Sequence, residues 1–234
     1  MTHLYDILAP ALGIANAAAL LVLFYLLVNG HARQYWTLLF YVGWELLATA
    51  ALTIADLYLN GTTQSHSVST NLYAWMYWSN DVTVDLFRFT LAAVLIYKTL
   101  ESPQPWLKRV LLGVGVAIVV ISALFWRDRD AQHPFAWLNS ISQLINFGAA
   151  ILNVVLWTAI LQSKKRDTRI MAVSIGLGIL VAGTAFSYGL RHFNKEGQFT
   201  AVVNLFLNLT QLLAWLIWCR AFWPDQRPKA PSVS

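Results

Sequence analysis

The sequence predicts an all-α, polytopic membrane protein, a seven-transmembrane-helix bundle that forms a single domain over residues 1–234. Hydrophobic residues make up 58% of the chain and charged residues 12%, which is about half the ~25% charged fraction of soluble domains. Apolar stretches of about 20 residues, long enough to cross a bilayer, recur along the sequence. Seven such stretches with short connections nearly fill the 234 residues, so no room remains for a separate soluble domain.

The apolar stretches define each helix in turn. They predict helices over residues 7–28, 35–58, 72–99, 107–126, 134–162, 169–192 and 199–222, followed by a short cytoplasmic tail at 223–234. The seven prolines fall at the predicted helix ends or in connections. Apart from the polar segment 59–71, the connections are short, which favours an up-down bundle in which sequential helices are neighbours.

The distribution of basic residues predicts the orientation of the helices. With the N-terminus outside, eleven Lys and Arg residues fall on the inner side and four on the outer side. Cytoplasmic loops carry an excess of Lys and Arg, so we expect the N-terminus outside and the C-terminus inside. The same arrangement brings tryptophans to both interfaces, as expected for aromatic belts.

Ionisable residues inside apolar spans are costly, so they must face protein or water. Glu45 and Asp56 are eleven residues apart on one stripe of the second helix, whereas Asp81, Asp85 and Arg88 share a face of the third. Glu45 and Arg88 have similar predicted depths, so Arg88 could engage Glu45 and Asp85 together. A purely structural role for these charges remains the alternative.

Amide side chains form two further stripes. Asn139, Gln143, Asn146 and Asn153 lie on the fifth helix, and Asn204, Asn208 and Gln211 lie on the seventh. If the stripes converge, they line a polar intramembrane cavity for a small ligand or proton, whose acidic outer half would suit a cationic or hydrogen-bonding ligand. Interhelical hydrogen bonds are the alternative. The candidate cavity residues are Glu45, Asp56, Asp81, Asp85, Arg88, Asn146, Asn153, Asn204, Asn208 and Gln211.

Several other chemistries are disfavoured. One cysteine, Cys219, forms no intramolecular disulfide and no cysteine-cluster metal site. The five histidines lie outside the spans or at their ends, and no lysine lies deep in the bundle to attach retinal. No hydrolase or phosphate-binding motif occurs. We therefore expect no catalytic residue, no metal, no cofactor and no nucleic-acid partner.

Two aromatic and acidic segments, YVGWE at residues 41–45 and YAWMYWSNDVTVD at 73–85, carry a family resemblance. With this pattern the chain resembles uncharacterised bacterial seven-helix membrane proteins and the seven-helix sensor modules of bacterial signalling proteins. Four polar stripes, uninterrupted helices and no effector domain together lead us to expect a receptor-like or accessory module of the inner cell membrane. Its partners would be the lipid bilayer, a small ligand from the outer side and a membrane protein. A small-molecule or proton-coupled transporter and a structural subunit of a membrane complex are the alternatives.

Overall fold

The computed structural model describes residues 2–61, 66–100, 105–127, 136–163, 167–193 and 197–224. Within these residues the chain forms seven α-helices and no β-strand. The helices are α1 (Thr2–Gly30), α2 (Trp36–Gly61), α3 (His66–Thr99), α4 (Pro105–Arg127), α5 (Ala136–Gln162), α6 (Thr168–Phe193) and α7 (Gly197–Phe222). The all-α prediction and the number of helices are thus confirmed for this part of the chain.

Five helices are long and apolar enough to cross a membrane, which supports a multi-pass membrane protein. Their apolar spans, within the described residues, are Ile7–Gly30, Trp36–Tyr58, Trp137–Gln162, Thr168–Leu190 and Phe199–Phe222. Helix α3 contains four charged residues, Asp81, Asp85, Arg88 and Lys98, and the apolar run of α4 is confined to Leu112–Ile121 among the residues described. For these two helices, membrane crossing therefore remains a prediction.

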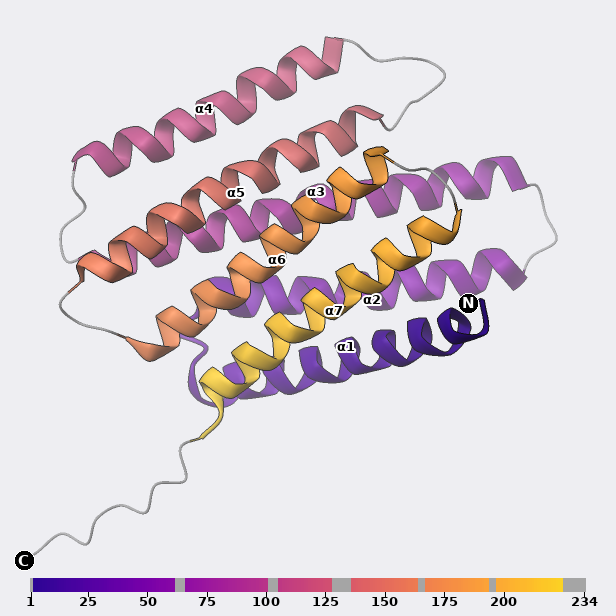
Figure 1. The fold of residues 1–234 in the computed structure, drawn as a ribbon, viewed down its shortest axis with the longest axis horizontal. Helices are drawn as coiled ribbons and strands as arrows, with labels where there is room; N and C mark the ends of the chain where they lie inside the picture. The colour runs from indigo at the N-terminus through magenta and orange to yellow at the C-terminus, as the bar shows by residue number, and fades with distance from the viewer. Residues whose placement is uncertain are drawn as a thin grey trace, which may run out of the picture.

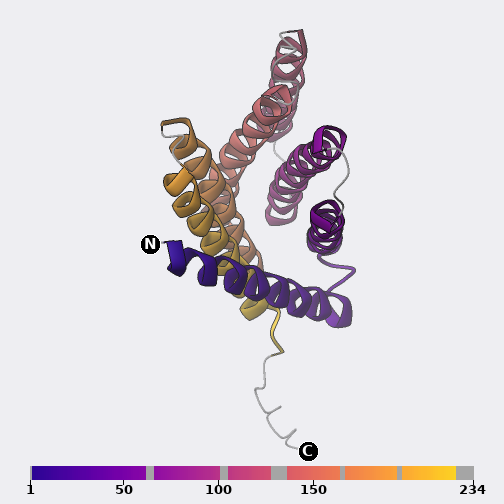
Figure 2. The ribbon, with the colours of Figure 1, turned by 90° about the vertical axis from the view of Figure 1, so that its right-hand side faces the viewer.

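The helices are stacked in layers between two peripheral helices, α4 and α1 (Figure 1). Helix α4 packs on α5, while α1 covers α2 and α7 at the opposite edge (Figure 2). Between these edges, α3 contacts α2, α5 and α6, and α6 contacts α5 and α7. The expectation of sequential neighbours fails at α4, because α5 rather than α4 packs most closely against α3. Helix α3 is thereby surrounded by α2, α5 and α6.

Two helices begin earlier than the hydrophobic pattern indicates. Helix α1 starts at Thr2 and includes Pro10, and α3 starts at His66, so part of the predicted polar connection 59–71 is helical. Apolar runs mark only the lipid-length part of a helix, and helices continue beyond it into polar sequence. The predicted tail beyond Pro224 and several basic connections lie outside the described residues.

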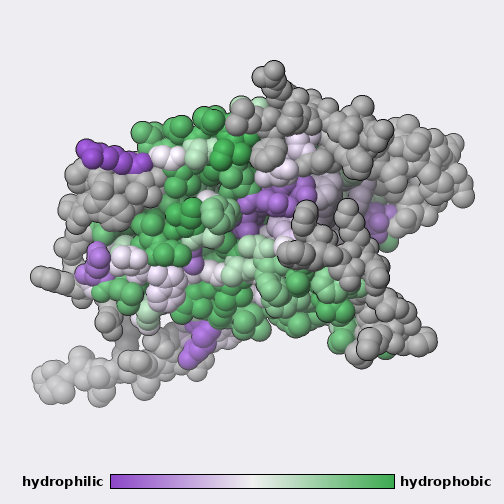
Figure 3. Space-filling view, turned by 45° about the horizontal axis from the view of Figure 1, so that its top comes forward, coloured by the Kyte–Doolittle hydropathy of each residue, from purple (hydrophilic) through white to green (hydrophobic). Residues whose placement is uncertain are grey.

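Large hydrophobic side chains cover much of the outside of the bundle. Leu21, Phe40, Leu47, Phe147 and Val154 are each at least 59% exposed. The described surface seen in Figure 3 is largely hydrophobic, with hydrophilic side chains gathered at one end and in a band near the centre. Soluble proteins rarely expose so much apolar surface, and a bilayer would cover it.

Candidate functional site

Polar side chains from four helices meet in the interior of the bundle. We call them the Arg88 cluster; its members are Tyr41 and Glu45 of α2, Asp81, Asp85 and Arg88 of α3, Ser142 of α5, and Thr184 and Tyr188 of α6. The central position of α3 brings these helices together. At the heart of the cluster, Asp85 is fully buried and Arg88 is 3% exposed.

The guanidinium of Arg88 is held on several sides. Its Nη1 donates to Asp85 Oδ1 at 2.9 Å and to Thr184 Oγ1 at 3.1 Å. Its Nε donates to the Tyr41 hydroxyl at 3.2 Å, and its Nη2 lies 4.0 Å from Glu45 Oε1. The structure pairs Arg88 directly with Asp85, whereas Glu45 lies only at ion-pair distance and its buried Oε1 has no hydrogen-bond partner.

The carboxylates of Asp85 and Asp81 meet at the hydroxyl of Ser142. Ser142 Oγ lies 2.6 Å from Asp85 Oδ2 and 3.0 Å from Asp81 Oδ2. It also lies 3.3 Å from the hydroxyl of Tyr188, which in turn donates to Asp81 Oδ2. These four oxygen atoms make four contacts of hydrogen-bond type.

The hydrogens available for these contacts are too few. Ser142 and Tyr188 carry one hydroxyl hydrogen each, and an ionised carboxylate carries none. Two hydrogens therefore serve four contacts unless Asp81 or Asp85 holds a proton. The charges give the same result, because three carboxyl groups, those of Glu45, Asp81 and Asp85, share the cluster with one guanidinium. The arrangement is chemically suited to hold an additional proton.

A cavity of about 40 Å³ adjoins the cluster on the side where Asp81 lies. Its walls include Asp81, Arg88, Tyr188 and Gln211, together with Ser187, whose buried hydroxyl has no hydrogen-bond partner. Sites for small organic ligands usually occupy about 300–1,000 Å³, whereas a water molecule takes up about 30 Å³ of liquid. The cavity is therefore large enough for water and too small for an organic molecule.

Aromatic side chains fill the core between the cluster and the end where α7 terminates. This aromatic layer consists of Tyr35, Tyr41, Trp215, Trp218 and Phe222, none more than 2% exposed. The rings of Trp215 and Trp218 lie 5.1 Å apart, and that of Tyr41 lies 5.7 Å from Trp215. These buried, closely packed rings lie between the cluster and that end of the bundle.

Tyr35 completes the layer in the turn between α1 and α2. Its ring packs edge-on against Phe222 at 4.9 Å, and the Lys98 ammonium lies 4.9 Å from the ring centroid. Burial, reinforced by the charge of Asp167, raises the pKa of the Tyr35 phenol to about 12.

Two of the predicted amide residues join helices outside the cluster, and others bond within their own helix. Asn146 Nδ2 donates to Val181 O at 3.2 Å, and Asn153 Oδ1 accepts from Ser174 at 3.3 Å, so both connect α5 to α6. On α7, Asn208 Nδ2 donates to the carbonyl of Asn204 at 3.0 Å. These contacts agree with the alternative of interhelical and local hydrogen bonds. Among the predicted amides, Gln211 reaches the cavity beside the cluster.

The structure separates Asp56 from the other predicted carboxylates. Asp56 is exposed on the outer face of α2, as are Thr49 and Thr53, whereas Glu45 of the same stripe is largely buried. Gln143 is likewise exposed on α5. A helical stripe has width, so residues at its edge can lie outside the protein interface although its centre is buried.

Sequence reasoning missed several members of the cluster. Ser142 follows Asn139 by three residues and precedes Asn146 by four, so it belongs to the same helical stripe and could have been identified there. Thr184 and Tyr188 are four residues apart on α6. Their hydroxyls are too common in membrane helices to be singled out without knowing which face of α6 meets α3.

Three comparisons were made with known proteins. No protein-family model, curated protein or solved structure matches this chain. The chemistry of the Arg88 cluster is therefore interpreted from its own residues and geometry.

Proposed function

We propose that this chain is a receptor-like or accessory integral membrane module that takes up a proton at the Arg88 cluster. The observation that carries the proposal is the shortage of hydrogens around Ser142, where two hydroxyl hydrogens serve four oxygen contacts. One proton shared by Asp81 and Asp85 supplies a third hydrogen and reduces the excess negative charge. Buried charges without compensation are costly, which favours this protonation.

Two features favour proton sensing over the other functions. The cavity of about 40 Å³ suits water-mediated proton delivery better than a small-molecule ligand. The buried rings of the aromatic layer lie between the cluster and the end where α7 terminates, which argues against a continuous transport path. A proton that enters from the other end would change the pairing of Arg88 and thereby the packing of α3 on α2, α5 and α6. A membrane protein partner would detect that change.

We further propose that all seven helices cross the inner cell membrane, with the N-terminus outside. At about 1.5 Å per residue, the 34 residues of α3 and the 23 residues of α4 each exceed the hydrocarbon thickness of about 30 Å. The excess of Lys and Arg in the connections on the side of the C-terminus supports the orientation. The cavity side of the cluster then faces outward.

Infrared difference spectroscopy of the purified protein tests the proposal, because a protonated carboxyl absorbs apart from a carboxylate. We expect a protonated-carboxyl band at neutral pH that is lost on alkalinisation. The band should disappear in both Asp81→Asn and Asp85→Asn, and it should persist in Asp56→Asn, the matched control on the outer face of α2. A band that is unchanged in the Asp81 and Asp85 variants would refute the proton site.

Proteoliposomes distinguish sensing from transport. We expect no pH-driven proton flux through the wild-type protein, because buried aromatic rings lie between the cluster and the end where α7 terminates. Flux that disappears in Glu45→Gln would instead support the transporter. If the chain is a structural subunit, we expect neither proton flux nor a protonated-carboxyl band that depends on Asp81 and Asp85.

A further inference from the structure

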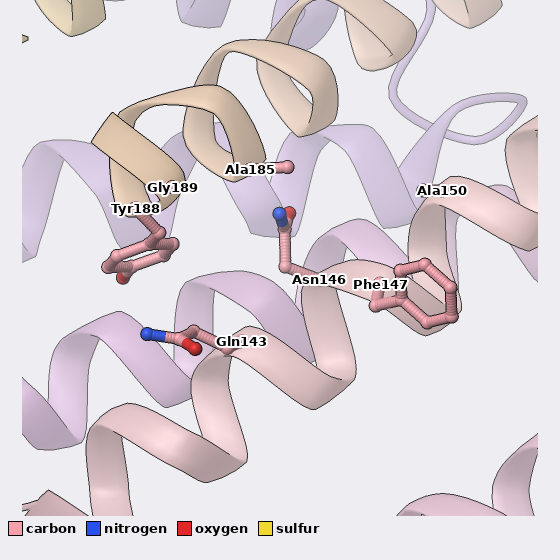
Figure 4. A pocket seen from close by; sticks show the side chains of 7 residues that line it. All are labelled: Gln143, Asn146, Phe147, Ala150, Ala185, Tyr188 and Gly189. Carbon is pink, nitrogen blue, oxygen red and sulfur yellow. The ribbon is translucent and has the colours of Figure 1, made fainter. Parts of the chain in front are cut away.

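A second and larger pocket opens between α5 and α6 (Figure 4). It has a volume of about 460 Å³, within the range of about 300–1,000 Å³ that is typical of small-molecule sites. Asn146 and Tyr188 point into the gap from the two helices, and Phe147, Ala185 and Gly189 supply apolar walls. The pocket is thus mainly apolar, with a few polar groups that converge.

One of these polar groups lacks a partner. Asn146 is 1% exposed, and although its Nδ2 donates to Val181 O at 3.2 Å, its buried Oδ1 accepts no hydrogen bond. Buried polar atoms are nearly always paired. The pocket therefore presents an acceptor that a ligand hydroxyl or amide hydrogen would satisfy.

The position of the pocket indicates where such a ligand comes from. Helices α5 and α6 are both among the five that are apolar enough to span a membrane. Phe147 is 63% exposed and Phe186 is 54% exposed on the outer faces of these helices. Asn146 lies ten residues into α5, about 15 Å from its start at 1.5 Å per residue. In the proposed membrane placement, the pocket opens laterally toward the lipid chains.

The charge of nearby residues restricts which lipid head group the pocket can accept. Tyr188 lines both the pocket and the small cavity and donates to Asp81. An anionic head group would therefore lie close to a carboxyl group in a medium of low dielectric, which is unfavourable. We propose that the pocket binds a neutral amphiphile that enters from the bilayer and consists of an acyl chain with a hydroxyl-bearing head group. This site does not depend on protonation of the Arg88 cluster.

Photoaffinity labelling of the full-length protein in phosphatidylcholine nanodiscs tests the site. The probe is a monoacylglycerol with a diazirine in its acyl chain. We expect labelling of α5 and α6, with competition by monooleoylglycerol about tenfold stronger than by methyl oleate, which has the chain but no donor. Oleate, with its anionic head, should also compete weakly. Equal competition by methyl oleate would overturn the hydroxyl requirement.

Two variants localise the binding. Asn146→Leu removes the acceptor, and Ala185→Phe fills the pocket from an exposed position that leaves the core intact. Each should reduce specific labelling about tenfold, while Ala51→Phe, at an exposed position on α2, should leave it unchanged. Undiminished labelling in Ala185→Phe would overturn the proposal even if Asn146→Leu failed to fold. Photoaffinity labelling measures binding of the amphiphile alone. A negative labelling result is therefore distinct from a negative infrared result for the proton site.

Discussion

The Arg88 cluster and the aromatic layer occupy successive levels of the same core and join the helices by different means. In the cluster, charged and hydroxyl groups of α2, α3, α5 and α6 meet around Arg88 and Ser142, and a cavity remains beside them. In the layer, rings from α2 and α7 pack in direct contact. Tyr41 belongs to both, because its ring contacts Trp215 and its hydroxyl accepts from Arg88. One level is suited to change its charge state, and the other is suited to stay rigid.

The largest expected effect comes from removing the cation of the cluster. Arg88→Met leaves Asp85 and Glu45 buried without their counter-ion. We expect the free energy of unfolding, measured by SDS titration in mixed micelles, to fall by about 3–5 kcal/mol, the usual cost of breaking a buried pair.

Tyr41→Phe is the control for this change, since it removes a neutral acceptor of Arg88 and keeps the ring. Its expected cost is about 1 kcal/mol. If Arg88→Met cost no more than Tyr41→Phe, the cluster would be better hydrated than its burial indicates.

Overpacking the aromatic layer should have an intermediate effect. Gly176 of α6 lies under Trp218, and a Cβ built at this position would lie 2.1 Å from the indole Nε1. Gly176→Ala must displace the ring, whose Nε1 donates to Val173 O at 3.0 Å. We expect the free energy of unfolding in the same titration to fall by about 1–3 kcal/mol.

Gly13→Ala provides the matched control, because nothing lies within 4 Å of a Cβ at that position on α1. Alanine is the better helix former there by about 0.5–1 kcal/mol. If Gly176→Ala changed the free energy of unfolding no more than Gly13→Ala does, the aromatic layer would not be rigid.

The smallest effect is expected at the carboxylate outside the cluster. Asp56→Asn changes an exposed side chain and should alter the free energy of unfolding by less than about 0.5 kcal/mol. Asp85→Asn replaces the buried charged acceptor of Arg88 by a neutral one and should cost about 1.5–3 kcal/mol. Similar values for the two variants would show that burial does not separate these carboxylates as the structure indicates.

The pairing of Glu45, Asp85 and Arg88 could be predicted because two independent constraints agree. Charged residues in apolar spans must face inward, and the helical repeat together with the counted depth brings Glu45 level with Arg88. The same reasoning failed for Asp56, which lies near the end of α2, where a carboxylate can reach water or head groups. A charged side chain must therefore face the protein interior only where it lies deep in the membrane-spanning part of a helix.

The sequence alone determined the all-α class, the seven helices of the described residues and the helix faces that carry the charged residues of α2 and α3, because hydropathy and the 3.6-residue repeat are local properties. Only the tertiary structure decided that α5 rather than α4 packs against α3, and hence that Ser142, Thr184 and Tyr188 complete the cluster. Helix order in a bundle depends on the fit of side chains between surfaces that are distant in sequence. Such contacts leave no periodic pattern in any single helix.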